Sequence, residues 1–258
     1  HQRMALAQRA ATRIVGDVVL DMPEFMGKFH CSARSDLFTV TVAEGAFEPG
    51  FAALLRQHLD PQRDFVDVGA NIGFYTVLAA QLLPCRRVLA IEPTAGAFTR
   101  LKANLTLNGV EGRVIAFKGA ASDRAGALTI HAIEGMEEFS SLGPIIHGAV
   151  AGQAVTTEQV PAETVDALVA RHGLDPGMIK IDVEGAEGQV LAGARATLER
   201  HRPVVLSELS RALLEPMGSS PEAIIAQFRA LDYQVIDAID PALAPGLRAQ
   251  GEVLCLPR

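Results

Sequence analysis

The sequence has only three cysteines in 258 residues, no tryptophan and two tyrosines. Cys31, Cys85 and Cys255 are scattered, without a Cys-x-x-Cys or Cys/His cluster, which argues against a disulfide framework and against a zinc site. A formal net charge of −7 makes an extended nucleic-acid backbone an unexpected partner. No apolar run is long enough to span a bilayer, and no signal-peptide pattern opens the chain. These absences predict a cytoplasmic protein with free thiols.

What the sequence does contain is a glycine-bearing turn between an apolar run and a helix-forming segment. Asp67 lies near the end of the run, Gly69, Asn71 and Gly73 form the turn, and residues 76–83 have helical composition. Glycine tolerates positive φ and lets the backbone approach a ligand closely. The free N–H groups of the helix start can then face that ligand. The pattern predicts a strand, turn and helix of the kind that opens a nucleotide site.

A second acid follows about 20 residues later, as a ribose-binding site requires. It is Glu92, at the end of the apolar run 87–92. The turn holds only two of the three glycines of the dinucleotide fingerprint, and no Gly-Lys-Ser/Thr follows it as in a P-loop. The turn is preceded by an acid, lacks the glycines that bind a pyrophosphate, and is followed by an acid that could bind ribose. This combination favours S-adenosylmethionine over a nicotinamide dinucleotide as the ligand. The alternative is a turn that merely joins a strand to a helix in another α/β protein.

Strands and helices alternate from residue 47 onward, which predicts an α/β fold with a doubly wound, mostly parallel sheet. The expected strands are residues 65–68, 88–92, 113–117, 128–133, 178–183 and 203–209, with an edge pair at 233–239 and 252–256. Residues 1–46 are expected to form an N-terminal extension, with a helix at 4–10 and a hairpin from strands 27–31 and 37–42. Residues 47–258 then form the main domain, and the Gly/Ser-rich segment 134–154 is expected to be a mobile loop over its site.

Lys180 and Asp182 are two residues apart on an expected strand, so they share one face of the sheet. A lysine and an acid inside an apolar run are costly to bury unless they form an ion pair or take part in function. They are either functional groups or an internal ion pair that supports the next loop. Glu208 ends the neighbouring strand, and parallel strand ends meet at one edge of a sheet.

The chain resembles the FkbM-type S-adenosylmethionine-dependent methyltransferases. The resemblance rests on two long motifs, residues 67–75 and 179–187, and on three shorter ones, residues 90–93, 118–122 and 140–142. It covers roughly residues 45 to 209. It implies a class I methyltransferase (Rossmann-like) fold with a seven-stranded sheet, and methylation of a hydroxyl on a sugar, polyketide or other natural product.

Carried over by position, the resemblance also implies roles in cofactor binding. Asp67 and Gly69 would hold the methionine end, Asn71 would shape the turn with Gly73, and Glu92 would take the ribose hydroxyls. Ala121 and Ser122 would flank the adenine, with Ser122 or Asp123 available for its amino group. Glu48 would approach the methionine moiety, or is simply an acid favoured at a helix start.

A hydroxyl acceptor benefits from a base that takes its proton as the bond forms. Asp182 is the first candidate, with Lys180 orienting the hydroxyl and Glu208 completing a Lys–Asp–Glu cluster. His131 or His147 could serve instead, although a histidine in a polar loop is usually solvated. A Mg²⁺-assisted reaction would use four acids whose carboxylate oxygens are hard ligands: Asp182, Glu184, Glu187 and Glu208. It is disfavoured because two of these acids stand near a helix start, and no resident metal is predicted.

Two other functions remain open from the sequence: a non-catalytic module that keeps the cofactor fold for interaction, and a methyltransferase for RNA ribose. The expected partner is a small-molecule or glycan acceptor with a hydroxyl group. Its pocket is expected to involve the N-terminal hairpin and segment 134–154. The apolar stripe of Phe74, Tyr75, Leu78 and Leu82 is expected to be core packing and not a substrate pocket. A homodimer is one assembly that the sequence allows.

Overall fold

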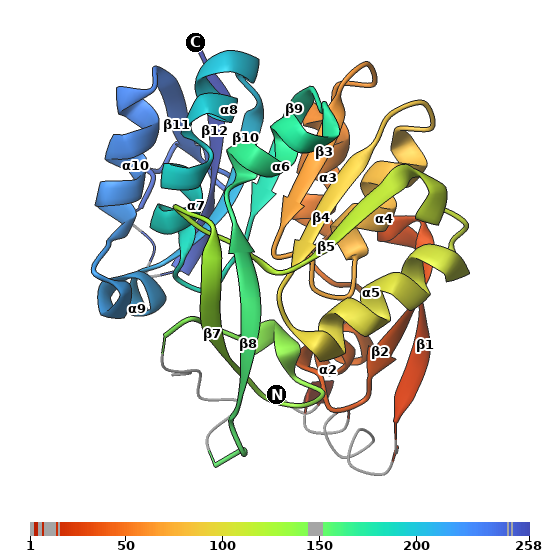
Figure 1. The fold of residues 1–258 in the computed structure, drawn as a ribbon. Coiled ribbons are helices and arrows are strands. Elements are labelled where there is room, and N and C mark those ends of the chain that lie inside the picture. Colours follow the sequence, from red (N-terminus) through yellow and green to blue (C-terminus); the bar gives the residue numbers. More distant parts are fainter. Residues whose placement is uncertain are drawn as a thin grey trace.

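The computed structural model describes residues 16–143, 152–246, 248 and 250–258, together with residues 3, 4, 7 and 14. Seven strands form the central sheet, in the order β11-β12-β10-β9-β3-β4-β5 (Figure 1). Their bounds are β3 Asp64–Val68, β4 Val88–Glu92, β5 Val114–Lys118, β9 Pro176–Ile181, β10 Val204–Ser210, β11 Tyr233–Asp237 and β12 Gln250–Pro257. Among the described helices, none is long and apolar enough to cross a membrane.

The sheet is mostly parallel, as the alternation of strands and helices predicts. β5, β4, β3, β9 and β10 run parallel to one another, and β12 runs antiparallel to both β10 and β11. The chain moves outward from β3 to β4 and β5, then returns to the other side of β3 with β9. The carboxyl ends of β3 and β9 therefore mark the switch point at which ligands of doubly wound folds bind.

Helices cover both faces of the sheet because each central strand is apolar on both sides. The side chains of one face pack on α3 Pro49–His58, α4 Phe74–Leu82 and α5 Ala95–Leu107. Those of the other face pack on α6 Val165–His172, α7 Glu187–Gly193, α8 Arg195–His201 and α10 Pro221–Ala230. A break at Ala194 separates α7 from α8, and the Ser220 hydroxyl caps α10 by accepting a hydrogen bond from the Ala223 N–H.

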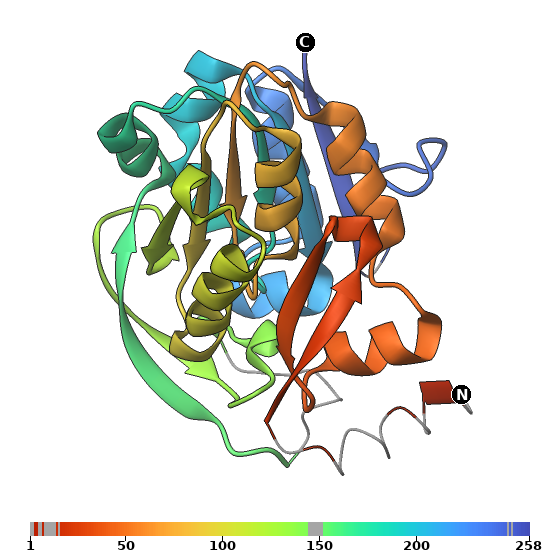
Figure 2. The same cartoon turned by 90° about the vertical axis from the view of Figure 1, so that its right-hand side faces the viewer.

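The N-terminal region differs from the sequence-based prediction. The hairpin pairs β1 Asp17–Met22 with β2 Gly27–Ser32, and residues 37–42, expected as its second strand, lie in the helix α2 Asp36–Glu44. The expected helix at 4–10 lies largely outside the described residues. The hairpin packs beside α4 and α5 in the same core as that face of the sheet, so this region is continuous with the main domain (Figure 2). The division at residue 46 remains a prediction.

A helix forms at 36–44 despite its β-branched residues because its N-terminus is capped twice. The Ser35 hydroxyl accepts a hydrogen bond from the Leu37 N–H, and the Glu138 carboxylate accepts one from the Asp36 N–H. Caps of this kind stabilise a helix by about 1 kcal/mol each. The second cap comes from a residue about 100 positions away in the sequence, so local propensity could not reveal it.

A smaller sheet lies beside the main one and joins β6 Ala120–Ala121, β8 Thr156–Glu163 and β7 Gly126–Ala132 in that order (Figure 1). The strand expected at 128–133 is β7, but it belongs to this sheet, and β8 has no counterpart among the predicted strands. The short helical turns are η1 Pro23–Phe25, η2 Glu111–Arg113, η3 Glu137–Phe139, α9 Arg211–Leu214 and η5 Glu215–Met217. Of the segment expected as a mobile loop, residues 134–143 connect β7 to the site, and 144–151 lie outside the described residues.

Candidate active site

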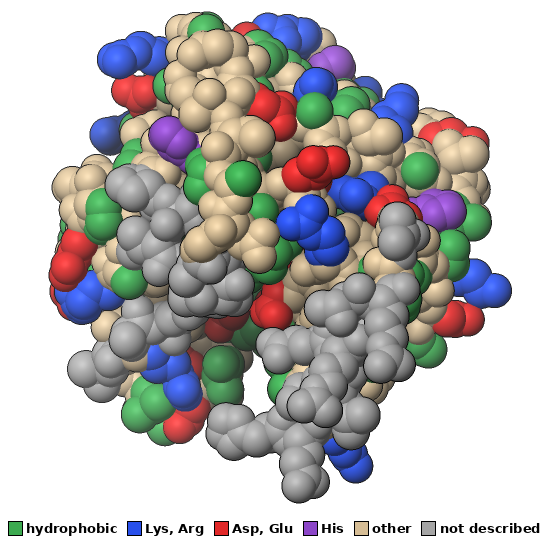
Figure 3. Space-filling model, turned by 90° about the horizontal axis from the view of Figure 1, so that it is seen from below, with side chains coloured by type: hydrophobic (Ala, Val, Ile, Leu, Met, Phe, Trp, Pro, Cys, Tyr) green, Lys and Arg blue, Asp and Glu red, His purple; other side chains and the backbone are tan. Residues whose placement is uncertain are grey.

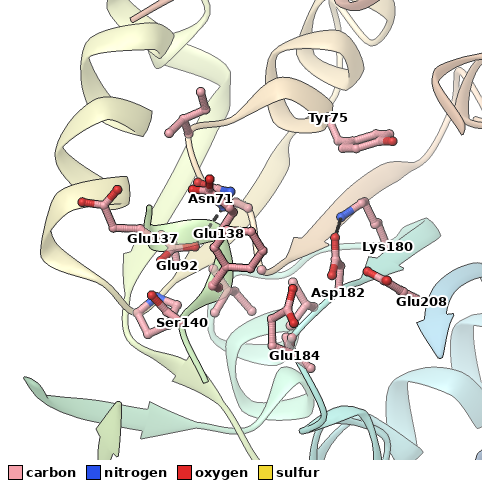
Figure 4. Close-up of a pocket in the computed structure, with 18 of the residues that line it drawn as sticks. Asn71, Tyr75, Glu92, Glu137, Glu138, Ser140, Lys180, Asp182, Glu184 and Glu208 are labelled. Atoms are coloured by element: carbon pink, nitrogen blue, oxygen red, sulfur yellow. Dashed lines mark hydrogen bonds and ion pairs between the residues drawn. The ribbon is translucent and has the colours of Figure 1, made fainter. Parts of the chain in front are cut away.

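A cavity of about 450 Å³ opens at the carboxyl ends of β3, β4, β9 and β10. Figure 3 shows the molecule from this end. The volume falls within the range of ligand pockets in proteins. The glycine turn and Glu92 form one part of its wall, and Lys180, Asp182 and Glu208 form another (Figure 4). The structure therefore brings the two sequence motifs to one cavity.

The glycine turn has the backbone that the sequence predicts, with positive φ at Gly69 (82°), Asn71 (49°) and Gly73 (96°). The backbone of the turn packs tightly against other parts of the protein at two of its glycines. A Cβ at Gly69 would overlap the Asp182 carbonyl oxygen, and one at Gly73 would lie 2.6 Å from Leu101 Cδ1. The glycines thus let β3 end directly against the chain that leaves β9, which joins the two parts of the cavity.

Glu92 is 5% exposed, and its carboxylate is fixed by hydrogen bonds from the protein. Oε2 accepts from the Asn71 N–H at 2.9 Å, and Oε1 accepts from the Thr94 N–H at 2.8 Å and the Thr94 hydroxyl at 2.7 Å. Burial raises the pKa of Glu92 to about 7, although these bonds favour the charged form. The result is a rigid acid at the cavity wall beside the turn.

Asp67 lies deeper than the sequence suggests. It is 1% exposed and is not among the described residues that line the cavity. Its Oδ2 accepts from the Thr76 hydroxyl at 2.6 Å, while Oδ1 has no hydrogen-bond partner within the described structure. Burial raises its pKa, and nearby Lys180 offsets part of that effect. Its predicted contact with methionine stays a prediction.

The predicted adenine-binding positions divide into two groups. Ala121 lines the cavity, whereas Ser122 and Asp123 are absent from the described lining. The Ser122 hydroxyl donates instead to Asp123 Oδ1 at 3.1 Å and to Gln189 Oε1 at 3.4 Å. Ser122 therefore serves the packing between β6 and α7 in this structure.

Lys180 and Asp182 form an ion pair at the cavity wall, with Lys180 Nζ 2.9 Å from Asp182 Oδ2. Lys180 is 7% exposed. Burial alone would lower the pKa of Lys180, but Asp182 and Asp67 outweigh it and raise the pKa. Burial alone would raise the pKa of Asp182, but Lys180 and a hydrogen bond from Glu208 outweigh it and lower the pKa. Lys180, Asp182 and Glu208 thus form the cluster that the sequence predicts.

Tyr75 belongs to the site, contrary to the expectation that its stripe is only core packing. Its hydroxyl donates to Glu48 Oε2 at 2.7 Å, and Lys180 Nζ lies 4.7 Å from its ring centroid. Phe74 is buried with it and lines the cavity as well, while Leu78 lies in the core as expected. Glu48 also lines the cavity, and burial raises its pKa. Its predicted approach to methionine is untested.

Residues 137–142 form another part of the wall and tie it to the N-terminal region. The Glu138 carboxylate accepts hydrogen bonds from the Ser35 hydroxyl at 2.9 Å and the Asp36 N–H at 2.6 Å. Glu137 pairs with Arg100, and Arg100 in turn pairs with Asp17 of the hairpin. Sequence reasoning placed this segment over the site but could not identify its anchors.

Of the two histidines considered as bases, the structure describes only His131. His131 lies on β7 outside the described lining, and its backbone pairs with Ser141. His147 lies outside the described residues. Asp182, Glu184 and Glu208 have carboxylate oxygens within 4.8 Å of one another, but Glu187 is outside this group and accepts hydrogen bonds from the Val183 and Gly185 N–H groups of the loop before its helix. The four-acid metal set is therefore reduced to three.

Comparison with known proteins connects this site to an enzyme family. A family model described as the methyltransferase FkbM domain matches residues 67–235. The chain is 30% identical over 205 residues to the 31-O-demethyl-FK506 methyltransferase FkbM of Streptomyces tacrolimicus, covering 69% of this chain and 75% of that protein. It is 29% identical to the 2-O-methyltransferase NoeI of Sinorhizobium fredii, covering 55% of this chain and 61% of that protein.

A solved structure supports the fold. The methyltransferase FkbM of Methylobacillus flagellatus superposes with a TM-score of 0.50 at 15% identity, over 99% of this chain and 59% of that one. The chain thus spans about three fifths of that protein's length. The class I, Rossmann-like fold predicted from the sequence is confirmed.

Proposed function

The chain belongs to the FkbM methyltransferase domain family, and from this membership we propose that it uses S-adenosylmethionine to methylate a hydroxyl group of a small molecule or glycan. The family model and the relatives support methyl transfer. The names of two relatives specify O-methylation, which supports an oxygen acceptor here. The observation that carries the proposal is the single cavity shared by Glu92 and the Lys180–Asp182 pair.

The residues around the glycine turn fit the nucleoside of S-adenosylmethionine. Glu92 is an acid with both oxygens already oriented by Asn71 and Thr94, which suits it to accept from ribose hydroxyls. Ala121 and the backbone of residues 69–73 would line the nucleoside side of the cavity. Buried Asp67, with one oxygen that lacks a hydrogen-bond partner in the described structure, lies close enough to Lys180 to help raise its pKa.

When bound, S-adenosylmethionine supplies a sulfonium methyl group that is already electrophilic. The protein then has to position an acceptor oxygen in line with it and remove the hydroxyl proton. Asp182 is the proposed proton acceptor because its carboxylate faces the cavity beside Lys180 (Figure 4). Lys180 is held between Asp182 and the Tyr75 ring, so its ammonium can orient the acceptor oxygen.

Two measurements test this proposal. Isothermal titration with S-adenosylmethionine and with its demethylated product should show binding to the wild type, and failure of both to bind at millimolar concentration would refute the cofactor. Incubation with labelled S-adenosylmethionine and cell extract of the source organism, followed by mass spectrometry, should identify a molecule that gains a methyl on oxygen. A methyl found on carbon or nitrogen instead would contradict the assignment of the acceptor atom.

A further inference from the structure

Three carboxyl groups form a row across adjacent strands of the sheet. Leu206 of β10 pairs with Lys180 of β9, so Glu208 stands at the level of Asp182, which directly follows the last residue of β9. Glu208 is in turn the direct partner of Glu252 in the antiparallel pairing of β10 with β12. Because side chains two residues apart share a face, all three carboxyl groups lie on the face that α3 and α4 cover.

Like charges directly opposite each other in a sheet are destabilising. The row nevertheless places Glu208 opposite Glu252 and beside Asp182, with Lys180 as the one basic side chain that lines the described cavity wall. Carboxylate oxygens of Asp182 and Glu208 lie within 4.8 Å of each other, and a hydrogen bond with Glu208 is one of the causes that lower the pKa of Asp182. Two carboxyl groups can hydrogen-bond only if one of them holds a proton. The row is therefore arranged to carry a proton between its members.

A small second pocket adjoins the row and shares Lys180, Asp182 and Glu208 with the lining of the main cavity. It measures about 10 Å³, close to the space that one water molecule needs. Its polar lining consists of Glu48, Tyr75, Lys180, Asp182, Glu208 and Glu252. Groups of this kind supply the two to four hydrogen bonds that a buried water requires. Glu252 is partly exposed, as Asp182 and Glu208 are, so a proton that reaches Glu252 can pass to solvent.

From this geometry we propose that the acceptor proton leaves the active site along the row from Asp182 through Glu208 to Glu252, with one water in the small pocket. The inference rests on the proposed function. In the step, the acceptor oxygen forms a bond to the methyl carbon, the carbon–sulfur bond breaks and sulfur keeps its electron pair. The O–H bond breaks, its proton passes to Asp182 and onward, and Glu252 releases a proton to water. Glu252 does not contact the acceptor and acts only through Glu208 and Asp182, so it is a positioning residue and not a catalytic one.

The row of carboxyl groups compensates for the weak basicity of Asp182. Lys180 and Glu208 hold the pKa of Asp182 low, and a carboxylate of low pKa is a poor base by itself. Burial, together with Glu48 and Asp182, raises the pKa of Glu252 to about 7. A proton that reaches Glu252 is therefore held by a group suited to neutral pH, whereas on Asp182 it would be held weakly.

The kinetic test uses the wild type and Glu252→Gln with labelled S-adenosylmethionine and the extract fraction that the wild type methylates. We expect turnover to fall roughly tenfold, with cofactor affinity unchanged. The rise of the wild-type rate through pH 7 should disappear, imidazole should restore part of the rate, and Glu252→Asp should retain more activity than Glu252→Gln. Glu199→Gln, an exposed glutamate on α8, is the matched control and should behave as the wild type. An unchanged rate and pH profile for Glu252→Gln would overturn the proposal.

A second measurement does not need an acceptor. Protein labelled with ¹³C at the glutamate carboxyl carbons is titrated by NMR, and the Glu252 signal is assigned by its loss in Glu252→Gln. Its midpoint should lie near pH 7 and should fall in Asp182→Asn, because the neighbouring negative charge is removed. A Glu252 midpoint at the ordinary value of a glutamate would contradict the proposed proton path. So would a midpoint that is unchanged in Asp182→Asn. If the wild type binds no S-adenosylmethionine, the proposed function fails, and this titration still decides whether the row exists.

Discussion

The two halves of the cavity hold their acids in different ways. On the β3–β4 side, the protein's own N–H and hydroxyl groups bind both oxygens of Glu92. On the β9–β10 side, Asp182 is bound by the ammonium of Lys180 and by another carboxyl group. The first arrangement fixes an acceptor of hydrogen bonds in one position, which suits binding. The second allows protons to redistribute, which suits chemistry.

This contrast predicts that the two functions can be separated by mutation. The largest effect is expected for Asp182→Asn, which keeps the shape of the side chain but removes its basicity. Methyl transfer should fall by roughly 10²- to 10⁴-fold, the usual contribution of a general base, while cofactor affinity changes little. Transfer of labelled methyl to the acceptor fraction measures the first quantity, and isothermal titration measures the second. Full activity in this variant would mean that the base lies elsewhere.

Glu92→Gln should have the opposite profile. The amide keeps the volume but presents an NH₂ group where an acceptor is needed, and it conflicts with the donors from Asn71 and Thr94. The affinity for S-adenosylmethionine should fall roughly 10- to 100-fold, as expected when hydrogen bonds to a charged group are lost. Titration of the variant beside the Glu199→Gln control checks this. Equal affinity in the two would remove the ribose assignment.

Stability should depend on pH in a direction that the buried acids determine. Burial raises the pKa of Glu92, Glu138, Glu187 and Glu252 to about 7, above the ordinary glutamate value of 4.5. The folded state therefore binds more protons than the unfolded state between these values, and this stability is lost as the pH rises through 7. The melting temperature should be lower at pH 8 than at pH 6, and Glu138→Gln should reduce the difference. A melting temperature that rises over this range would contradict the shifts.

The smallest effect is expected for Ser122→Ala. Since its hydroxyl bonds to Asp123 and Gln189 outside the cavity lining, cofactor affinity should change less than about twofold, and loss of the weak bonds should cost at most about 1 kcal/mol of stability. Titration and thermal unfolding measure the two quantities. A tenfold loss of affinity would restore Ser122 to the adenine site that the family resemblance implies.

The sequence predicts the central sheet well because its central strands are continuous, buried and mostly apolar runs. It misplaces the N-terminal strand because the β-branched run 37–42 is a helix whose start is capped by distant Glu138. It overlooks β8, whose polar, partly exposed residues lack the pattern of a core strand.

The residues of the candidate site also divide into those that the sequence predicts and those that it does not. Glu92, Lys180 and Asp182 are predictable as cavity residues because each stands at or near a strand end beside a readable motif, whereas Asp67, also near a strand end, lies outside the described lining. Tyr75 and Glu252 are not predictable, since one looks like an ordinary core residue of a helix and the other joins the site only through the register of β12 against β10. Register between distant strands is set by tertiary packing, which a single sequence does not display.

The most direct test of the account is a crystal structure of the protein with S-adenosylhomocysteine, the demethylated product of the proposed cofactor. We expect the ribose hydroxyls within hydrogen-bond distance of the Glu92 carboxylate and the sulfur facing Lys180 and Asp182 across the cavity. A nucleoside bound away from Glu92, or a sulfur that points away from the lysine–aspartate pair, would contradict it.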